Sequence, residues 1–344
     1  MIYFSLIILT FITSWVFTGV LRHYALTKNL LDMPNARSSH LTPTPRGGGL
    51  AIAVTFLISI IVLTSIKHLE ISTIIGFLIG GALVALAGFI DDHWRISVRW
   101  RLLVHFVVAG WILYWFDGLP LLSITGITVD MYWLGYLPLT IYLVWLLNLY
   151  NFMDGIDGIA SIEAITVCIG GMVLYWLLDA DSTSLIVLTL LIASVAGFLF
   201  WNFPRAKIFM GDAGSGFIGI IMGTFSIHSV LIDPVLFWCW LILLAAFIVD
   251  ASLTLLRRVS KGARFYEAHR SHAYQHASIK YQSHVRVSIA FGVINLVWLL
   301  PISILVAIKW LDAPIGVVIA YVPLILLALK FKAGIPTELL KITD

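Results

Sequence analysis

Long apolar runs, each about the length of a membrane-spanning helix, dominate this sequence and leave room for few other folds. A helix that crosses a bilayer needs roughly 20 apolar residues. The chain of 344 residues is 60% hydrophobic and 11% charged, whereas about a quarter of the residues in soluble globular proteins are charged. We predict an all-α, polytopic membrane protein that forms one domain over residues 1–344. About eleven transmembrane helices are expected, at residues 2–21, 48–66, 71–90, 102–117, 136–150, 160–178, 184–202, 214–232, 235–256, 287–308 and 314–330.

The positions of Lys and Arg predict the orientation of the chain. Cytoplasmic loops carry an excess of these residues, and the connections after the odd-numbered spans, together with the C-terminal tail, hold 19 of the 21. Lys67 and Lys309 fall on the other side. We therefore expect a periplasmic N-terminus and a cytoplasmic C-terminus. The net charge of +3 follows from this asymmetry and gives no reason to expect a nucleic-acid partner.

The connections on the predicted cytoplasmic side are unusually polar. Each carries ionisable, amide or Gly residues where a short turn would suffice, whereas the opposite connections are short, apart from a hairpin predicted within residues 117–135. We therefore predict a functional site at the cytoplasmic face. The polar segments span residues 30–49, 91–101, 148–158, 202–216 and 257–276.

The first chemical signal is the acidic pair Asp91 and Asp92, which closes an apolar helix. Two negative charges at a helix C-terminus oppose the helix dipole. Adjacent carboxylates also repel one another unless they share a proton or a divalent cation. A helix end that simply meets water is the alternative, but the pair favours a functional site.

In and just before the segment NFMDGIDGIA at residues 151–160, Asn and Asp residues recur at every third position, starting at Asn148. Asn148, Asn151, Asp154 and Asp157 would share one face of a helix, with glycines that keep the backbone close to a ligand. A turn rich in Asn and Gly is the alternative. It does not explain two carboxylates at matched spacing, so we predict a second part of the site here.

Two further segments add groups for anions. Asp212 stands among glycines before an apolar helix in FMGDAGSG, where it is either a helix cap or part of an anion site. HRSHAYQH supplies His269, Arg270 and His272, which suit a phosphate better than zinc because the Arg would repel a cation. A basic loop near lipid headgroups is the alternative. Asp250, inside an apolar span, is either functional or a buried hydrogen-bond partner.

Carboxylates for a divalent ion, cations for phosphates and Gly-lined backbone together describe a site for a diphosphate–metal complex. Phosphoryl transfer needs those parts and little covalent machinery. In this order, DMPNARSSH…TPRGGG, DD, NLYNFMDGIDG, FMGDAGS and HRSHAYQ resemble the motifs of the polyprenyl-phosphate N-acetylhexosamine-1-phosphate transferases, glycosyltransferase family 4. The resemblance covers nearly the whole chain.

The resemblance implies an enzyme of the bacterial inner membrane. Such an enzyme transfers N-acetylhexosamine-1-phosphate from a UDP-sugar to undecaprenyl phosphate in the membrane lipid and releases UMP, with Mg2+ or Mn2+ as cofactor. Dimers occur in the family, so a homodimer is one expected assembly. A transporter or lipid flippase is the alternative function, but it would carry charges through the middle of the membrane and internal repeats, which we do not find in the sequence.

The resemblance also implies a role for each matching residue. Asp91, Asp92, Asp154 and Asp212 would be catalytic, with Asp91 deprotonating the lipid phosphate, and Asp212, Asp92 and Asp154 would hold the metal. Phe209 would stack on uracil. Substrate contacts are implied for Asn148, Asn151, Asp157, Asn202, Phe209, His269, Arg270, His272, Arg46 and His40.

Two departures separate this chain from the peptidoglycan branch of the family. That branch carries three consecutive His in the last motif and a Lys after the acidic pair, where this chain has HRSHAYQ and Arg95. The chain therefore resembles the branch that starts O-antigen, capsule or teichoic acid-type glycans. Which UDP-sugar it uses, and whether transfer takes one step or two, stay open at this point.

Overall fold

A computed structural model describes residues 1–34, 40, 42–67, 71–94, 96–116, 122–124, 127–129, 132–180, 182–264 and 269–336. This part of the chain is almost entirely helical. The α-helices are α1 (Ile2–Thr27), α2 (Leu50–Ile66), α3 (Ile71–Trp94), α4 (Val98–Trp115), α5 (Tyr136–Met153), α6 (Ile159–Leu177), α7 (Ser182–Asn202), α8 (Asp212–His228), α9 (Val235–Leu243), α10 (Ala245–Ser260), α11 (Ala273–Tyr281), α12 (His284–Ile294), α13 (Leu300–Ala307) and α14 (Ala313–Lys330).

Short elements connect the helices. Strands β1 (Leu31–Asp32) and β2 (Thr44–Pro45) form one antiparallel ribbon, and β3 (Leu122–Ile124) and β4 (Ile127–Val129) form another. The second ribbon confirms the predicted hairpin. Two 3-10 helices span Tyr132–Gly135 and Ser229–Leu231, and a π-helix over Asn295–Leu299 joins α12 to α13.

Each predicted span coincides with one helix or with consecutive helices, but not every helix meets the length and hydropathy expected of a membrane crossing. Within the described ranges, eight helices do, or nine if α9 and α10 form one span bent by 68°. The apolar helix α2 has only 17 residues. Two arginines near the start of α4 lower its hydropathy. The polytopic all-α class is confirmed, whereas the count of eleven and the orientation stay predictions.

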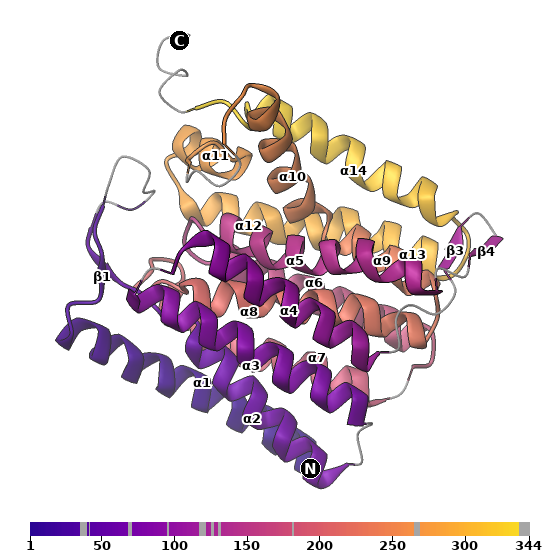
Figure 1. The fold of residues 1–344 in the computed structure, drawn as a ribbon, viewed down its shortest axis with the longest axis horizontal. Helices are drawn as coiled ribbons and strands as arrows, with labels where there is room; N and C mark the ends of the chain where they lie inside the picture. The colour runs from indigo at the N-terminus through magenta and orange to yellow at the C-terminus, as the bar shows by residue number, and fades with distance from the viewer. Residues whose placement is uncertain are drawn as a thin grey trace.

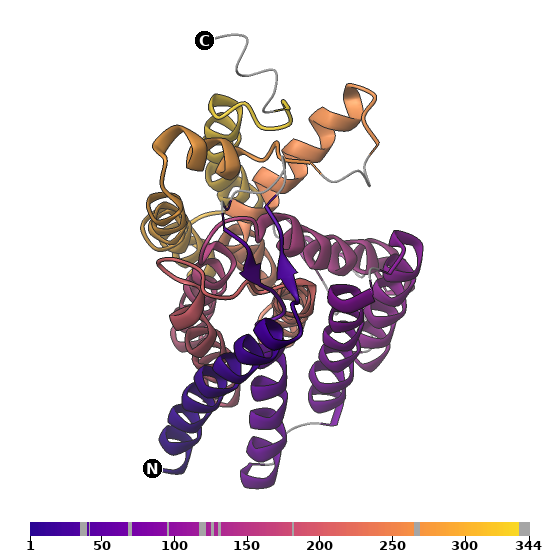
Figure 2. The same cartoon turned by 90° about the vertical axis from the view of Figure 1, so that its left-hand side faces the viewer.

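The helices lie side by side, with α1 and α2 at one edge and α14 at the opposite edge (Figure 1). The β1–β2 ribbon and α11 lie at one end of the bundle. The β3–β4 hairpin and the N-terminus lie at the other end. Figure 2 looks onto the end that carries β1 and β2 and shows α10, in orange, leaning out from the other helices. The described parts of the polar segments singled out in the sequence gather at this end.

Helix α8 is the centre of the bundle. Every residue from Ala213 to Ile227 is buried, and α8 packs against both α3 and α5. Burial of apolar surface does not drive helices together inside a bilayer, so close packing through small residues has to do so. Gly88 of α3 faces the backbone of Asp212 and Ala213, and Gly49 faces Gly214. These contacts fix the start of α8 against its neighbours.

We expect Gly88→Ala to destabilise the protein by about 1–3 kcal/mol, the usual effect of overpacking a tight contact. An added Cβ would lie 2.5 Å from backbone atoms of Asp212 and Ala213. Gly110→Ala in α4 is the matched control, because a Cβ there meets nothing within 4 Å. Thermal unfolding in detergent measures both. Equal unfolding temperatures for the two variants would contradict the tight α3–α8 contact.

Two features differ from the sequence prediction. Residues 235–256 were expected to form one span, but the helix breaks at Leu244 and bends by 68°. The segment 257–276 was expected to be a loop, but α11 begins within it, and residues from Ala273 to Ser278 are buried. A search for runs of about 20 apolar residues cannot find a polar nine-residue helix like this one.

Candidate active site

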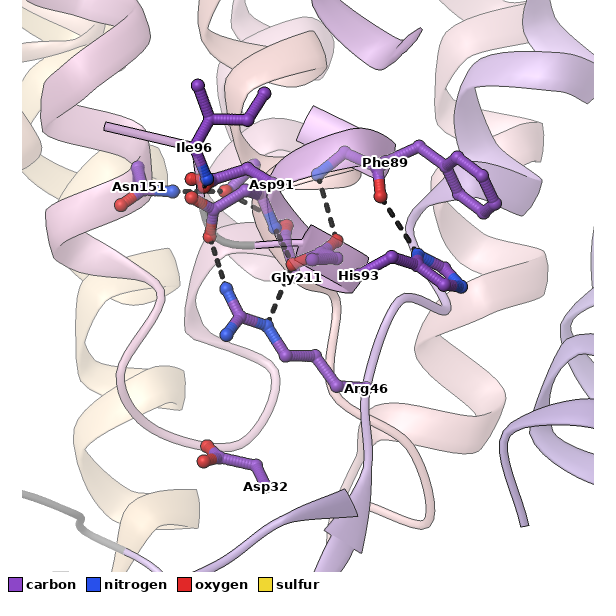
Figure 3. Close-up of polar contacts among 12 residues, drawn as sticks. Asp32, Arg46, Phe89, Asp91, His93, Ile96, Asn151 and Gly211 are labelled. Carbon is purple, nitrogen blue, oxygen red and sulfur yellow. Dashed lines mark hydrogen bonds and ion pairs between the residues drawn. The ribbon is translucent and has the colours of Figure 1, made fainter. Parts of the chain in front are cut away.

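Arg46, which follows β2, bridges two carboxylates from different helices. Its Nε lies 2.8 Å from Asp92 Oδ1, and its NH2 group donates to Asp212 Oδ1 at 2.6 Å. Figure 3 shows Arg46 reaching into the carboxylate cluster while Asp32 lies apart. Burial acts to lower the pKa of Arg46, but the charges of Asp92 and Asp212 outweigh it and hold the pKa above its ordinary value. The guanidinium therefore stays charged.

Arg101 of α4 makes a second bridge, which the sequence reasoning missed. Its NH1 group lies 3.0 Å from Asp91 Oδ2 and 3.1 Å from Asp212 Oδ2. Asp212 thus sits between two arginines. In the sequence, Arg101 contributed only to the charge asymmetry. Its position at the end of DDHWRISVRWR, ten residues after Asp91 and near the start of the next helix, could have indicated a contact with the acidic pair.

Asp92 connects the end of α3 to the start of α8. Its carboxylate accepts hydrogen bonds from the backbone N–H groups of Asp212 (3.1 Å) and Ala213 (3.3 Å). Gly211 precedes them with φ +76°, and a Cβ there would collide with Asp92. A carboxylate is favourable at a helix N-terminus. The favourable contact with the start of α8 therefore offsets the unfavourable position of the Asp92 charge at the C-terminal end of α3.

The four residues of the 148–157 spacing do not share one helical face. Helix α5 ends at Met153, Asp154 is its C-cap, and Gly158 has φ +75°. Asp157 lies beyond the turn, with its carboxylate 3.3 Å from His284 Nδ1. The prediction of one helical stripe is wrong because the chain leaves the helix at Asp154 and turns through glycines.

The two asparagines on α5 are held by hydrogen bonds. Asn151 donates to Ser215 Oγ at 3.3 Å, and Asn148 donates to the Val144 carbonyl at 2.6 Å. In the described part of the chain, no hydrogen bond or ion pair reaches the Asp154 carboxylate. Burial, and then the charge of Asp212, raise the pKa of Asp154 well above its ordinary value. A cation beside Asp154 would therefore favour its ionised form.

A large cavity of about 800 Å3 opens over these residues. Its polar side includes Asp91, Arg101, Asp154 and Asp212. Its other side is apolar and comes from α4 and α5. Phe106 and Ile141 in this wall are 45% and 53% exposed, so the wall continues onto the outer surface of the bundle. The apolar wall consists of Val98, Leu102, Phe106, Ile141, Val144 and Trp145.

A small cavity of about 400 Å3 lies on the other side of the cluster. Phe209 and His40 line it with ring centroids 4.8 Å apart. Asn202 also lines it. The side chain of Asn202 accepts from Gly158 N at 2.8 Å and donates to the Ile208 carbonyl at 2.9 Å, so it fixes two loops. The residues that line both cavities are Arg46, Asn151, Asp154, Gly155, Asp212 and Gln275.

The last motif contributes histidines to the large cavity. His269 and His272 line it, with their rings stacked at 5.0 Å, whereas Arg270 is not among the lining residues of either cavity. Burial, followed by His272 and Arg258, lowers the pKa of His269 to about 3. His269 is therefore neutral at pH 7 and suited to hydrogen bonding. Arg95, the other point of departure from the peptidoglycan branch, lies outside the described residues.

The residues at the junction of the cavities fit a hard divalent cation. Among the described residues, no three His, Cys, Asp or Glu side chains are close enough to hold a metal by themselves. Mg2+ often takes only one or two carboxylates and completes its shell with water and substrate phosphates. Asp154 and Asp212 offer only oxygen atoms there, and the Asp154 carboxylate is otherwise unpaired. Asp92 lines neither cavity, so metal ligation by Asp92 stays a prediction.

The chain is similar to several known proteins. Residues 74–230 match glycosyl transferase family 4. A Bacillus subtilis protein named probable undecaprenyl-phosphate N-acetylglucosaminyl 1-phosphate transferase is 29% identical over 73% of this chain and 70% of its own length. A Mycobacterium leprae decaprenyl-phosphate N-acetylglucosaminephosphotransferase is 29% identical over 80% of this chain and 77% of its own. A Thermotoga maritima undecaprenyl-phosphate alpha-N-acetylglucosaminyl 1-phosphate transferase is 29% identical over 63% and 62%, respectively.

Proposed function

Because this chain belongs to glycosyl transferase family 4, with the polyprenyl-phosphate N-acetylhexosamine-1-phosphate transferases, we propose that it transfers N-acetylhexosamine-1-phosphate from a UDP-sugar to undecaprenyl phosphate and releases UMP. One observation carries the proposal. Two cavities of different character meet at Arg46, Asp154 and Asp212. A reaction between a nucleotide-sugar and a lipid phosphate needs this meeting of two binding spaces at one charged centre.

The small cavity suits the nucleotide. Phe209 offers a ring on which uracil can stack, and His40 lies beside it. Asp157 lines the same space and offers carboxylate oxygens to uridine, and Asn202 fixes the two loops that shape this space. The diphosphate would then extend toward Arg46, which lines both cavities.

The large cavity suits the lipid acceptor. The apolar wall from α4 and α5 reaches the outer surface of the bundle, where a prenyl chain partitions into the membrane. Arg101 and Asp91 lie on the polar side of the same cavity. The acceptor phosphate would therefore face Arg101, with Asp91 as the candidate base for its proton.

The proposed chemistry is an in-line exchange of one phosphoanhydride for another. An oxygen of the lipid phosphate forms a bond to the β-phosphorus of the UDP-sugar, and the bond from that phosphorus to the bridging oxygen breaks, so that UMP leaves. No ATP is consumed. Arg46 and Arg101 orient the two phosphates and offset their charge. Mg2+ or Mn2+, held by Asp212 and Asp154 with Asp92 behind them, would neutralise further charge on the diphosphate.

We expect purified protein to move radiolabel from a UDP-N-acetylhexosamine into an organic-extractable lipid. EDTA should stop this transfer, and added Mg2+ or Mn2+ should restore it, because Asp154 and Asp212 need a cation between them and the diphosphate. Protein boiled before the assay is the control. If the protein is folded and no UDP-sugar of a panel labels the lipid, the transferase proposal is wrong. A transporter or lipid flippase would then be the favoured function.

The same assay addresses the biological role that we propose. A panel of UDP-N-acetylglucosamine, UDP-N-acetylgalactosamine and their 6-deoxy relatives would identify the sugar. We propose that the product starts an O-antigen-like or capsule-like surface polysaccharide in the bacterial inner membrane, and that the enzyme works as a homodimer. The HRSHAYQ motif departs from that of the peptidoglycan branch and therefore supports a role in surface polysaccharide synthesis.

A further inference from the structure

Asp250 is a buried carboxylate in α10 that collects hydrogen bonds from a neighbouring helix. It is 3% exposed. Its oxygens accept from the backbone N–H groups of Ala273 and Tyr274, both at 2.9 Å, and Oδ1 lies 3.3 Å from His272 Nδ1. Thr254 of the same helix donates to Oδ1 at 3.2 Å. Asp250 is thus a hydrogen-bond partner of α11 and its N-cap residue, although α11 belongs to another part of the sequence.

This arrangement uses the start of α11 completely. A helix N-terminus can bind a phosphate through its free N–H groups, but Asp250 already occupies those of Ala273 and Tyr274. The His272 N–H is also used, since it donates to Gln275 Oε1 at 3.2 Å. A phosphate in the large cavity must therefore be met by side chains of this motif.

His272 is the side chain that Asp250 controls. Nδ1 is directed at Asp250, the side chain also accepts from the Gln275 backbone N–H, and the ring lines the large cavity. A hydrogen bond between a carboxylate and one ring nitrogen fixes the orientation of an imidazole. Tyr274, next along α11, donates to the Phe152 carbonyl at 3.0 Å, two residues before Asp154. Asp250 therefore links α10 to the chain segment that carries Asp154.

We propose that Asp250 is a positioning residue of the transferase site: it holds His272 so that Nε2 faces the phosphate bound in the large cavity. This inference rests on the proposed function. The sequence left two roles open for Asp250, a functional one and a structural hydrogen bond. Asp250 acts through its hydrogen bonds to His272 and α11, and it does not itself line the large cavity.

The test compares Asp250→Asn with Glu163→Gln, a second buried carboxylate in an apolar span, which accepts from Asn295 at 2.7 Å and lines neither cavity. We expect Asp250→Asn to lower kcat by about 10- to 100-fold, the scale for losing a residue that orients a ligand-contacting imidazole. Glu163→Gln should stay within about twofold, which is small beside that effect. In a His272→Ala background, Asp250→Asn should have almost no further effect. Losses that multiply in the double variant would overturn the proposal.

A second pair of variants keeps the proposal testable if Asp250→Asn does not fold. The amide nitrogen of Asn in His272→Asn can take the place of Nδ1, and that of Gln in His272→Gln can take the place of Nε2. Both should lose transfer, because one lacks the cavity contact and the other lacks the bond to Asp250. Full activity of His272→Gln would overturn the proposal. A wild-type protein that labels no lipid would instead refute the proposed function, so the two failures are distinguishable.

Discussion

Asp212→Asn should abolish transfer, with a loss of about a thousandfold or more, since charged groups aimed at the reacting phosphates are often the largest single contribution to catalysis. Asp212 accepts from Arg46 at 2.6 Å and from Arg101 at 3.1 Å, and it lines both cavities. Asn has the same shape but no charge, so it cannot balance two arginines and is a much weaker ligand for a divalent cation. The initial rate of lipid labelling measures the effect.

Asp233→Asn is the matched control for Asp212→Asn. Asp233 lies beyond the opposite end of α8, where it accepts from Val235 N at 2.9 Å and pairs with Lys309, which is 72% exposed. Exposed ion pairs contribute about 0–1 kcal/mol, so this variant should keep wild-type activity and stability. Transfer by folded Asp212→Asn at a rate within tenfold of the control would remove Asp212 from the centre of the site.

The sequence was sufficient for the class of fold and for the segments that make the site. A bilayer demands long apolar helices, so the spans stand out by composition alone. Polar and charged residues in the connections, beyond those that a short turn requires, then indicate where the site lies. Asp91, Asp154 and Asp212 were found in this way, and the structure brings all three to one cavity.

The sequence was not sufficient for the partners of these residues. Spacing along one helix predicts which side chains share a face, but it says nothing about the neighbouring helix. Asp92 capping α8 and Arg101 reaching Asp212 both depend on how α3, α4 and α8 pack. The stripe predicted for Asn148 to Asp157 failed for a related reason, because the spacing continued after the helix had ended.

The bend between α9 and α10 had no local signal either. Neither Pro nor Gly stands at the break, which lies at Leu244 in a continuous apolar run. Its consequence is nevertheless clear in the structure. Helix α10 leans out from the bundle (Figure 2), and its Asp250 meets the start of α11. The placement of the last motif therefore depends on a feature that composition cannot reveal.

Arg101→Ala should lower transfer by about a hundredfold to a thousandfold, the range for removing one preorganised donor from a charged transition state. Arg101 is the group that the sequence did not single out, and it binds Asp91 and Asp212 at once. Among the residues that the structure describes, its loss would leave these two neighbouring carboxylates with only Arg46, on Asp212, to offset their charge. Arg101→Lys should recover only part of the activity, because Lys keeps the charge but places a compact, strongly hydrated ammonium where the guanidinium NH1 group contacts both carboxylates.

Arg99→Ala is the control that makes this result specific. Arg99 lies two residues earlier on α4 and is exposed to solvent, and it is not among the residues that line either cavity. Both variants remove one positive charge from the same membrane surface, so any effect on orientation in the bilayer is shared. Equal activities of Arg99→Ala and Arg101→Ala would mean that α4 contributes general charge. A large loss confined to Arg101→Ala would instead show that α4 contacts both parts of the acceptor. Its apolar face would contact the lipid chain, and Arg101 would contact the phosphate.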